Sequence, residues 1–331
     1  MRLEVTLYNA GLKNIWDDFV ENSKNGTFML KRDYMDYHSD RFKDFSLMIY
    51  EEDKLVALLP ASLHGTELRS HGGLTYGGVV SNKKMTVQKM LNVFAAMREF
   101  LKSNWINSLI YKRIPLIYHL YPSDEDLYAL FRNDAKLIRR DISAAILLED
   151  KIKFSDLRKR GIKKALKHGL TVRQSNDFET YVDLLAKILQ EYHGAKPVHT
   201  AAELSLLAGR FPDNIKLFAA YDGQGKMYAG SVIFDTKQTV HTQYIANSDE
   251  GRVIGALDLV FDYLINDYCF SSRSYEENFS GQKFAKKYFD FGTSNEDEGR
   301  YLNNGLISQK EGFGGRGIAY DFYEMKINSQ S

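Results

Sequence analysis

The sequence contains very little cysteine and proline, with one cysteine, Cys269, and five prolines in 331 residues. A single cysteine excludes an intrachain disulfide framework and any metal site built from several cysteines, and no metal is expected. Cys269 ends an apolar segment, where a small buried hydrophobic residue is the more common role. No proline-rich or low-complexity linker separates the two halves of the chain.

Excess charge of one sign and long apolar runs are also missing. Lys and Arg total 44 against 43 Asp and Glu, a net charge of +1, so no global field attracts nucleic acid or an anionic membrane. No stretch approaches the roughly 18 apolar residues of a membrane span, and the charged N-terminus is unlike a signal peptide. We therefore expect a cytoplasmic protein without a membrane span. The sequence does not indicate its oligomeric state.

The pattern of elements repeats along the chain. Hydrophobic residues make up 44% and charged residues 26%, as in soluble globular proteins, and the length favours two domains. The first half predicts a strand at 3–8, helices at 13–24 and 28–37, a hairpin at 45–65, a helix at 85–102, a strand at 107–114, a helix from 122 and a strand at 139–148. The second half predicts helices at 154–168, 178–192 and 201–210, a three-strand meander at 215–247, a helix at 252–268, a strand at 287–292, a helix at 303–313 and a last strand at 318–327. This order predicts two α+β units in tandem, each a mixed and mostly antiparallel sheet flanked by helices, covering 1–150 and 151–331.

Three short motifs sharpen this pattern into a family resemblance. "RGIKKALKHG" (160–169) resembles the segment that opens the second domain of Fem-type transferases, with its isoleucine one residue closer than in that pattern. "YFDFG" (288–292) is similar to the strand before their last helix, and "GLISQKEGFG" (305–314) to their G-L-x-x-x-K-x-x-F-G signature. The order of elements is that of the GNAT acyltransferase superfamily. The chain thus resembles a tandem-GNAT protein of the Fem type or of the related envelope-polysaccharide acyltransferases.

The resemblance implies a function. Fem-type enzymes add amino acids to peptidoglycan precursors, often from aminoacyl-tRNA and with a helical hairpin in the second domain that this sequence lacks. The relatives without the hairpin usually move an acyl group to an amino sugar. We therefore expect an N-acyltransferase that uses acetyl-CoA as acyl donor and acts in cell envelope polysaccharide biosynthesis. Charged tRNA as donor, or a non-catalytic binding protein with a degenerate site, are the alternatives.

The donor diphosphate is expected at "SDEGRVIGALDLV" (248–260), which follows a strand and opens an amphipathic helix. Backbone N–H groups at such a point bind anions. The loop partly matches the superfamily pattern Q/R-x-x-G-x-G/A, through Gly251, Arg252, Gly255 and Ala256. Asp249 and Glu250 place acid beside this anion site, and a capped helix start is the competing interpretation.

Lys310 stands in the signature segment, near the donor site according to the resemblance, and is a candidate both for binding a donor phosphate and for catalysis by stabilising the developing oxyanion. Its position near a helix end also suits a cation interacting with the helix dipole, which contributes about 0.3–1 kcal/mol, and Gly314 and Gly315 suit the left-handed end of that helix. The superfamily's usual tyrosine acid is replaced by Ser308. His241 is the candidate base, since its ordinary pKa suits accepting an amine proton, although a structural role is more common for a strand histidine.

Alternation along the strand places His241, Gln243 and Ile245 on one face and Thr242 and Tyr244 on the other, with Tyr244 as a further catalytic candidate. For the acceptor, "SHGGLTYGGVV" (70–80) has four glycines beside His71, Thr75 and Tyr76. This composition indicates backbone that approaches a ligand, or an irregular crossover. The resemblance assigns the acceptor to the first domain, so these three residues are the candidates for binding it. Glu277, a carboxylate in the second half of the chain, is a further candidate for substrate binding. The basic residues of 158–168 surround their helix, and one or two could reach a donor phosphate.

Overall fold

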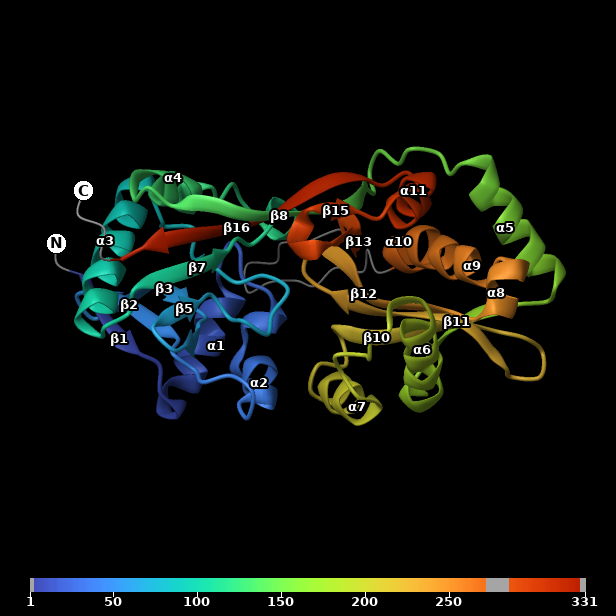
Figure 1. The fold of residues 1–331 in the computed structure, drawn as a ribbon, viewed down its shortest axis with the longest axis horizontal. Helices are drawn as coiled ribbons and strands as arrows, with labels where there is room; N and C mark the ends of the chain where they lie inside the picture. The colour runs from blue at the N-terminus through green and yellow to red at the C-terminus, as the bar shows by residue number, and fades with distance from the viewer. Residues whose placement is uncertain (1–2, 272–285, 328–331) are drawn as a thin grey trace. The chain divides into compact units, whose positions relative to one another are not determined.

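The computed structural model describes residues 3–271 and 286–327 (Figure 1). The chain folds into two compact units. Unit 1 comprises residues 1–142, 297–301 and 319–331, and unit 2 comprises 143–296 and 302–318. The predicted boundary near residue 150 is therefore close to the first crossing. The assignment of everything beyond it to the second domain is wrong, because the last strand pairs inside unit 1.

Unit 1 is a set of short strands covered by helices. Its elements are β1 (Leu3–Leu7), α1 (Lys13–Glu21), α2 (Arg32–Met35), β2 (Leu47–Glu51), β3 (Lys54–Leu59), β4 (Ser62–His64), β5 (Glu67–Arg69), β6 (Val80–Ser81), α3 (Val87–Ser103), β7 (Ser108–Lys112), α4 (Glu125–Arg132) and most of β8 (Lys136–Leu147). Strands β1, β2, β3 and β6 pair in that order, as do β4, β5, β7 and β16 (Arg316–Lys326). Helix α3 buries Met90, Phe94, Met97 and Leu101 in the core of the unit, the three- and four-residue spacing expected for an amphipathic helix.

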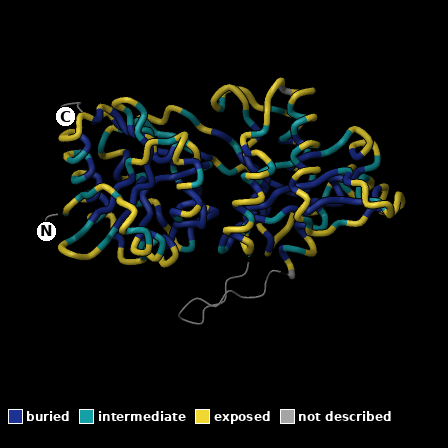
Figure 2. The backbone as a smooth tube through the Cα atoms, turned by 90° about the horizontal axis from the view of Figure 1, so that it is seen from below, coloured by how far each residue is buried: buried dark blue, intermediate teal, exposed yellow. Residues whose placement is uncertain are grey.

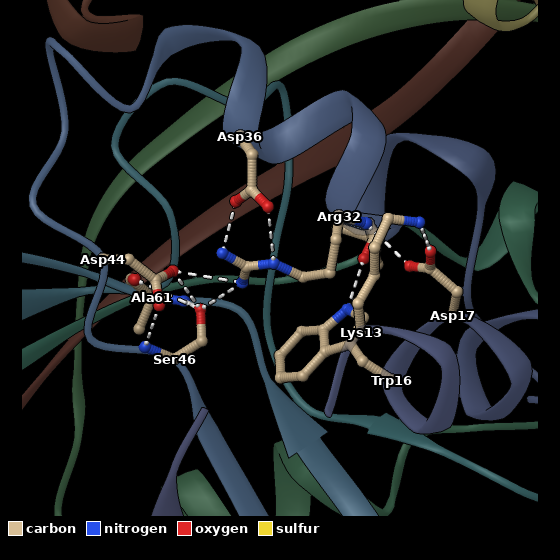
Figure 3. A network of polar contacts seen from close by, with 9 residues as sticks. Lys13, Trp16, Asp17, Arg32, Asp36, Asp44, Ser46 and Ala61 are labelled. Atoms are coloured by element: carbon tan, nitrogen blue, oxygen red, sulfur yellow. Dashed lines mark hydrogen bonds and ion pairs between the residues drawn. The ribbon is translucent and has the colours of Figure 1, made fainter. Parts of the chain in front are cut away.

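A buried arginine organises the N-terminal part of unit 1 (Figure 3). Arg32 is 2% exposed and pairs with Asp36 and, at 3.1 Å, with Asp44. Its guanidinium carbon lies 3.8 Å from the ring centroid of Tyr8, and the indole N–H of Trp16 donates to the carbonyl of Leu30. The charge of Arg32 is met by carboxylates of its own unit, so it is not available to a ligand, and removing these carboxylates would leave a buried charge without compensation.

Unit 2 is a larger sheet with helices on both faces. Its elements are α5 (Asp156–Lys167), β9 (Thr171–Ser175), α6 (Phe178–His193), α7 (Ala201–Arg210), β10 (Ile215–Tyr221), β11 (Met227–Asp235), β12 (Thr239–Asn247), α8 (Asp249–Ile254), α9 (Ala256–Asp262), a π-helical turn (Tyr263–Tyr268), α10 (Cys269–Ser271), β13 (Tyr288–Thr293) and α11 (Asn304–Gly312). Strands β8, β13, β12, β11, β10 and β9 pair in that order. Helices α8 and α9 cover one face of the meander β10–β12, and α6 and α7 the other (Figure 1).

Local sequence signals explain most helix ends of unit 2. Thr200 and Glu203 form a reciprocal capping box at the start of α7, and Ser155 caps α5. The helix predicted over 252–268 is instead broken at Gly255, where φ is +81°. A Cβ at Gly255 would lie 2.3 Å from the carbonyl oxygen of Gly161, so only glycine permits this close approach of α5.

Figure 2 shows buried backbone in dark blue through the interior of each unit and exposed stretches in yellow towards its outside. The core of unit 2 gathers Phe261, Phe289, Phe291 and Phe313, whose rings meet edge to face or tilted at 4.9–6.3 Å. Within residues 3–271 and 286–327, no helix has both the length and the apolar character needed to cross a bilayer.

Two buried histidines of unit 1 predict sensitivity to mild acid. Burial and neighbouring cations lower the pKa of His71 to about 3, and burial and Arg113 lower the pKa of His119 to about 4. The unfolded chain binds these protons near pH 6.5 and the folded chain does not. The free energy of unfolding is therefore at its full value, with respect to these two groups, above pH 6.5 and falls as the pH decreases towards 4. Each histidine should remove about 2 kcal/mol of unfolding free energy by pH 5.

Urea denaturation at pH 7 and pH 5 measures this loss. His71→Asn should make the pH dependence shallower, since Asn does not titrate and tolerates the positive φ of +50° at this position. His168→Gln, at an exposed position, is the control. A pH dependence that His71→Asn leaves unchanged would contradict the assignment.

Candidate functional site

Strands β12 and β13 lie side by side and then separate. They pair in parallel at Thr239↔Tyr288, Val240↔Phe289 and His241↔Asp290. Beyond Asp290, β13 turns at Gly292, where φ is +74°, and Thr293 pairs with Ser143 of β8. Strand β12 pairs with β11 along one edge over its length. In the described part of the chain, its other edge, which faces β13, therefore has no strand beside it from residue 242 to 247. Backbone N–H and C=O groups on such an edge can bind an extended ligand.

A β-bulge changes the faces of β12. Val232 is opposite Tyr244 and Ile233 is opposite Thr242, so Gln243 is the extra residue. Val240 and Ile245 both pack in the core beneath α9. The predicted alternation is therefore wrong after the bulge, and Tyr244 comes to the same face as His241.

On that face Tyr244 has a partner that the sequence did not suggest. Its hydroxyl hydrogen-bonds Nδ1 of His199, a buried residue just before α7. Burial raises the pKa of Tyr244 to about 12, so the phenol keeps its proton near neutrality. Tyr244 is consequently able to donate a hydrogen bond and unable to act as a base at pH 7.

His241 occupies the point where the strands separate and is itself buried, at 4% exposed, so a ligand has to reach it along the open strand edge. Its Nδ1 lies 2.7 Å from Oδ2 of Asp290, which is fully buried. The other oxygen, Oδ1, accepts hydrogen bonds from Ser143 Oγ and, at 3.1 Å, from the backbone N–H of Gly292. A carboxylate held in this way fixes the imidazole ring and keeps the proton on Nδ1, which leaves Nε2 as the nitrogen that can accept a proton.

Asp290 and Ser143 were not identified from the sequence. The available signal was an aspartate inside the apolar strand "YFDFG", because a buried carboxylate is retained only with partners. The partners lie 49 and 147 residues away along the chain. No local pattern identifies them.

Lys310 lies beneath the same turn. It is 3% exposed, and its Nζ donates to the carbonyls of Gly292 at 2.8 Å and Thr293 at 2.7 Å. Burial lowers the pKa of Lys310 to about 8, and the negative charge of Asp290 counteracts part of this shift. This burial contradicts the competing interpretation of Lys310 as a cation that only complements the helix dipole. Lys310 fixes the turn that takes β13 away from β12.

The glycines after Lys310 end the helix as the sequence predicted, at least in part. Gly314 has φ of +92°, and a Cβ there would lie 2.5 Å from the carbonyl oxygen of Ile152. Gly315 does not adopt a positive φ, but its N–H closes the helix on the carbonyl of Lys310 at 3.2 Å. The end of α11 is thus packed against the segment that precedes α5.

A basic pocket lies between α5 and α8, beside the end of β12. It has a volume of about 360 Å³, and its polar lining comes from Arg158, Arg160, Lys164, Asn247, Arg252, Asp258 and Gln309. Arg158 pairs with Asp258, the carboxylate of the pocket lining, at 2.6 Å. The other three cations of the lining, Arg160, Lys164 and Arg252, do not pair with it. Four cations and one carboxylate make this a pocket suited to an anion.

The pocket contains only part of the predicted diphosphate loop. Arg252 and Gly255 line it. Ala256 is fully buried in the core, and a Cβ at Gly251 would lie 2.5 Å from Oδ1 of Asn247, so these two residues serve packing. The nearby acids are occupied by other partners, since Glu250 pairs with Lys226 and Asp249 accepts from the hydroxyl of Tyr192 at 3.0 Å.

The glycine-rich loop of unit 1 does not form an open wall. His71 is 3% and Tyr76 1% exposed, and Tyr76 donates to Thr27 Oγ1 at 3.1 Å. Buried Lys112 donates to the backbone carbonyls of His71 and Leu74 and holds the loop in place. The expectation that His71 and Tyr76 face a ligand is therefore wrong. Thr75 is half-buried, and Glu277 lies outside the described residues.

Solved structures share this fold at low sequence identity. FemX matches with a TM-score of 0.66 and 11% identity, over 96% of each chain. L-PGS from Bacillus licheniformis matches with a TM-score of 0.60 and 13% identity, over 98% of this chain and 94% of that one. A tandem GNAT protein from the clavulanic acid biosynthesis pathway matches with a TM-score of 0.51 and 10% identity over the whole of both chains. No family model and no curated protein sequence matches. The chain thus has a tandem GNAT-like, Fem-type fold, as its order of elements predicted.

Proposed function

We propose that this protein is an N-acyltransferase that moves an acyl group, acetyl in the simplest case, from acyl-CoA to an amino group of a sugar or cell-envelope precursor. One observation carries the proposal: the open edge of β12 joins His241 at one end to the basic pocket at the other. His241 and Asn247 are six residues apart, about 20 Å along a strand. An extended acyl-pantetheine arm fits along this edge, with its phosphates among Arg160, Lys164 and Arg252.

The chemistry follows from the groups at each end. The acceptor amine attacks the thioester carbonyl, whose developing negative charge is stabilised by N–H groups of the β12 edge. Nε2 of His241 takes the amine proton, and Asp290 stabilises the resulting imidazolium. The CoA thiolate then leaves. Because Ser308 stands where a tyrosine acid would be expected, the leaving group departs without protonation from α11, or with a proton from Tyr244.

The acceptor side is assigned to unit 1 on the resemblance alone. Thr75 is the residue of the 70–80 loop that keeps both a polar group and partial exposure. A donor of this class is used in the cytoplasm, so we place the protein there. The substrate amine is the unknown that a screen of amino sugars and cell-wall peptides would identify.

Charged tRNA is the second candidate donor. The FemX and L-PGS structures match this fold with higher TM-scores than the tandem GNAT protein does. The basic pocket also suits a terminal tRNA phosphate. The two donors differ in the footprint they require, because tRNA needs cations well beyond the pocket.

Ligand-induced stabilisation tests the choice of donor. CoA at about 100 times its Kd should raise the unfolding free energy by roughly 2.7 kcal/mol. The double variant Lys164→Gln/Arg252→Gln should weaken CoA binding at least about tenfold, as expected from the loss of charged hydrogen bonds to phosphate. Thermal shift with CoA, acetyl-CoA and charged tRNA measures both effects.

Lys83→Gln/Lys84→Gln is the matched control, since it removes the same charge from an exposed loop of unit 1. A shift with tRNA alone would establish the second donor. No shift with any of the three ligands, on folded protein, would favour a non-catalytic binding protein and contradict the proposal.

A further inference from the structure

Different residues of helix α5 line two separate pockets. Arg158, Arg160 and Lys164 belong to the basic pocket described above. Lys159, Ile162, Lys163 and Leu166 follow one another at spacings of three, one and three residues, and so lie on a different face. This second face lines a separate groove of about 450 Å³, which the proposed reaction does not use.

The groove has an apolar floor and a lysine rim. The floor is made by Ile152 and Phe154, from the segment before α5, and by Ile162 and Leu166 of α5. The rim carries Lys151, Lys153, Lys159 and Lys163, all exposed, against one carboxylate, Asp262. Four positive charges against one negative charge, in a chain whose net charge is +1, concentrate positive potential here.

The lysines are largely uncommitted. The Nζ of Lys151 contacts the neutral amide oxygen of Asn266, and Lys159 is 3.4 Å from the highly exposed Asp156. Among the described residues, Lys153 and Lys163 have no ion pair. Asp262 accepts from Asn266 Nδ2 at 2.7 Å, and partial burial raises its pKa. The rim is thus available to an external anion.

The floor is anchored within unit 2 by backbone and ring contacts, but two of its side chains are largely exposed. The backbone N–H of Ser155 donates to the carbonyl of Gly312 at 2.7 Å, and Phe154 packs edge to face on Phe313. Even so, Leu166 is 57% and Ile152 46% exposed. Large apolar side chains grouped among lysines form a surface that suits a partner with both negative charge and apolar groups.

We propose that this groove docks the protein on the surface of an anionic lipid bilayer. Two features favour a bilayer over an acidic peptide. All four rim cations are lysines, which suit diffuse attraction to many headgroups, whereas arginine is preferred for directed pairing with peptide carboxylates or phosphates. Leu166 and Ile152 are largely exposed beside these lysines, and apolar side chains next to basic ones are the composition of surfaces that enter the boundary between headgroups and acyl chains. This inference does not depend on the proposed acyl transfer.

Vesicle co-sedimentation tests the proposal. The full-length protein should sediment with vesicles of phosphatidylcholine mixed with phosphatidylglycerol, and should not sediment with phosphatidylcholine alone. Binding should weaken as salt is raised. Lys159→Gln/Lys163→Gln should lower the partition coefficient by roughly 30-fold, because each lysine near an anionic surface contributes about a fivefold change. Leu166→Ser should weaken binding to the anionic vesicles at both low and high salt.

The control is again Lys83→Gln/Lys84→Gln, which removes the same charge from an exposed loop of unit 1 and should leave vesicle binding unchanged. An unaltered melting temperature of each variant shows that folding is intact. Failure to bind anionic vesicles overturns the proposal, as does an equal loss in the control. Saturable binding of monomeric dodecyl phosphate or of an acidic amphipathic peptide without vesicle binding would also overturn it, and would identify a pocket for a single molecule or a peptide groove instead.

Discussion

His241→Gln is expected to lower the rate of acyl transfer by about 100- to 10,000-fold, the usual contribution of a general base. Glutamine retains the size and a hydrogen bond to Asp290 but has no group that accepts a proton at neutral pH. The affinity for CoA should remain, because the basic pocket is at the other end of β12. The measurement is release of free thiol from acetyl-CoA in the presence of an acceptor amine, with CoA-induced thermal shift as the binding readout.

The control for this experiment is His168→Gln, which removes an exposed histidine from the end of α5. Asp290→Asn adds a second test, since losing the carboxylate that holds the imidazole ring should lower the rate of transfer while CoA binding is retained. A normal rate in His241→Gln would give His241 the structural role that is common for a strand histidine. Asp290 would then be a buried anchor for Ser143 and the turn at Gly292.

Lys310→Met is expected to lower the free energy of unfolding by about 2–4 kcal/mol. Methionine fills a similar volume but leaves the buried carbonyls of Gly292 and Thr293 without their donor, and each such loss costs about 1–3 kcal/mol, partly offset by no longer burying a charge. The turn that separates β13 from β12 should loosen, so CoA binding and turnover should fall as well. Urea denaturation and CoA-induced thermal shift measure the two effects separately.

Lys136→Met is the matched control, since Lys136 is exposed on β8 and should change stability by less than about 0.5 kcal/mol. A similarly small effect of Lys310→Met would restore the interpretation of Lys310 as a cation at a helix end. A large loss of stability with normal CoA affinity in the folded protein would separate the structural role of Lys310 from any role at the donor site.

The sequence by itself determined what depends on neighbouring residues. The capping box of Thr200 and Glu203, the left-handed glycine after α11 and the apolar stripe of α3 are all set by backbone sterics and by contacts three or four residues apart. These signals define the elements and their order, and the order was enough to predict the tandem GNAT-like fold. The basic character of 158–168 was equally plain, although the sequence did not show that its charges divide between two faces.

The tertiary structure decided what depends on residues far apart. The pairing of His241 with Asp290 and Ser143 requires three strands in one register, and the bulge at Gln243 turns Tyr244 to the other face of β12. Burial also reversed two expectations: Lys310 and His71 look like available polar groups in the sequence, but packing removes both from solvent. The last strand, β16, pairs with β7 of unit 1, which lies far earlier in the chain. A hydrogen bond or a strand pair between distant segments leaves no periodic trace in the sequence, because its geometry exists only after the chain has folded.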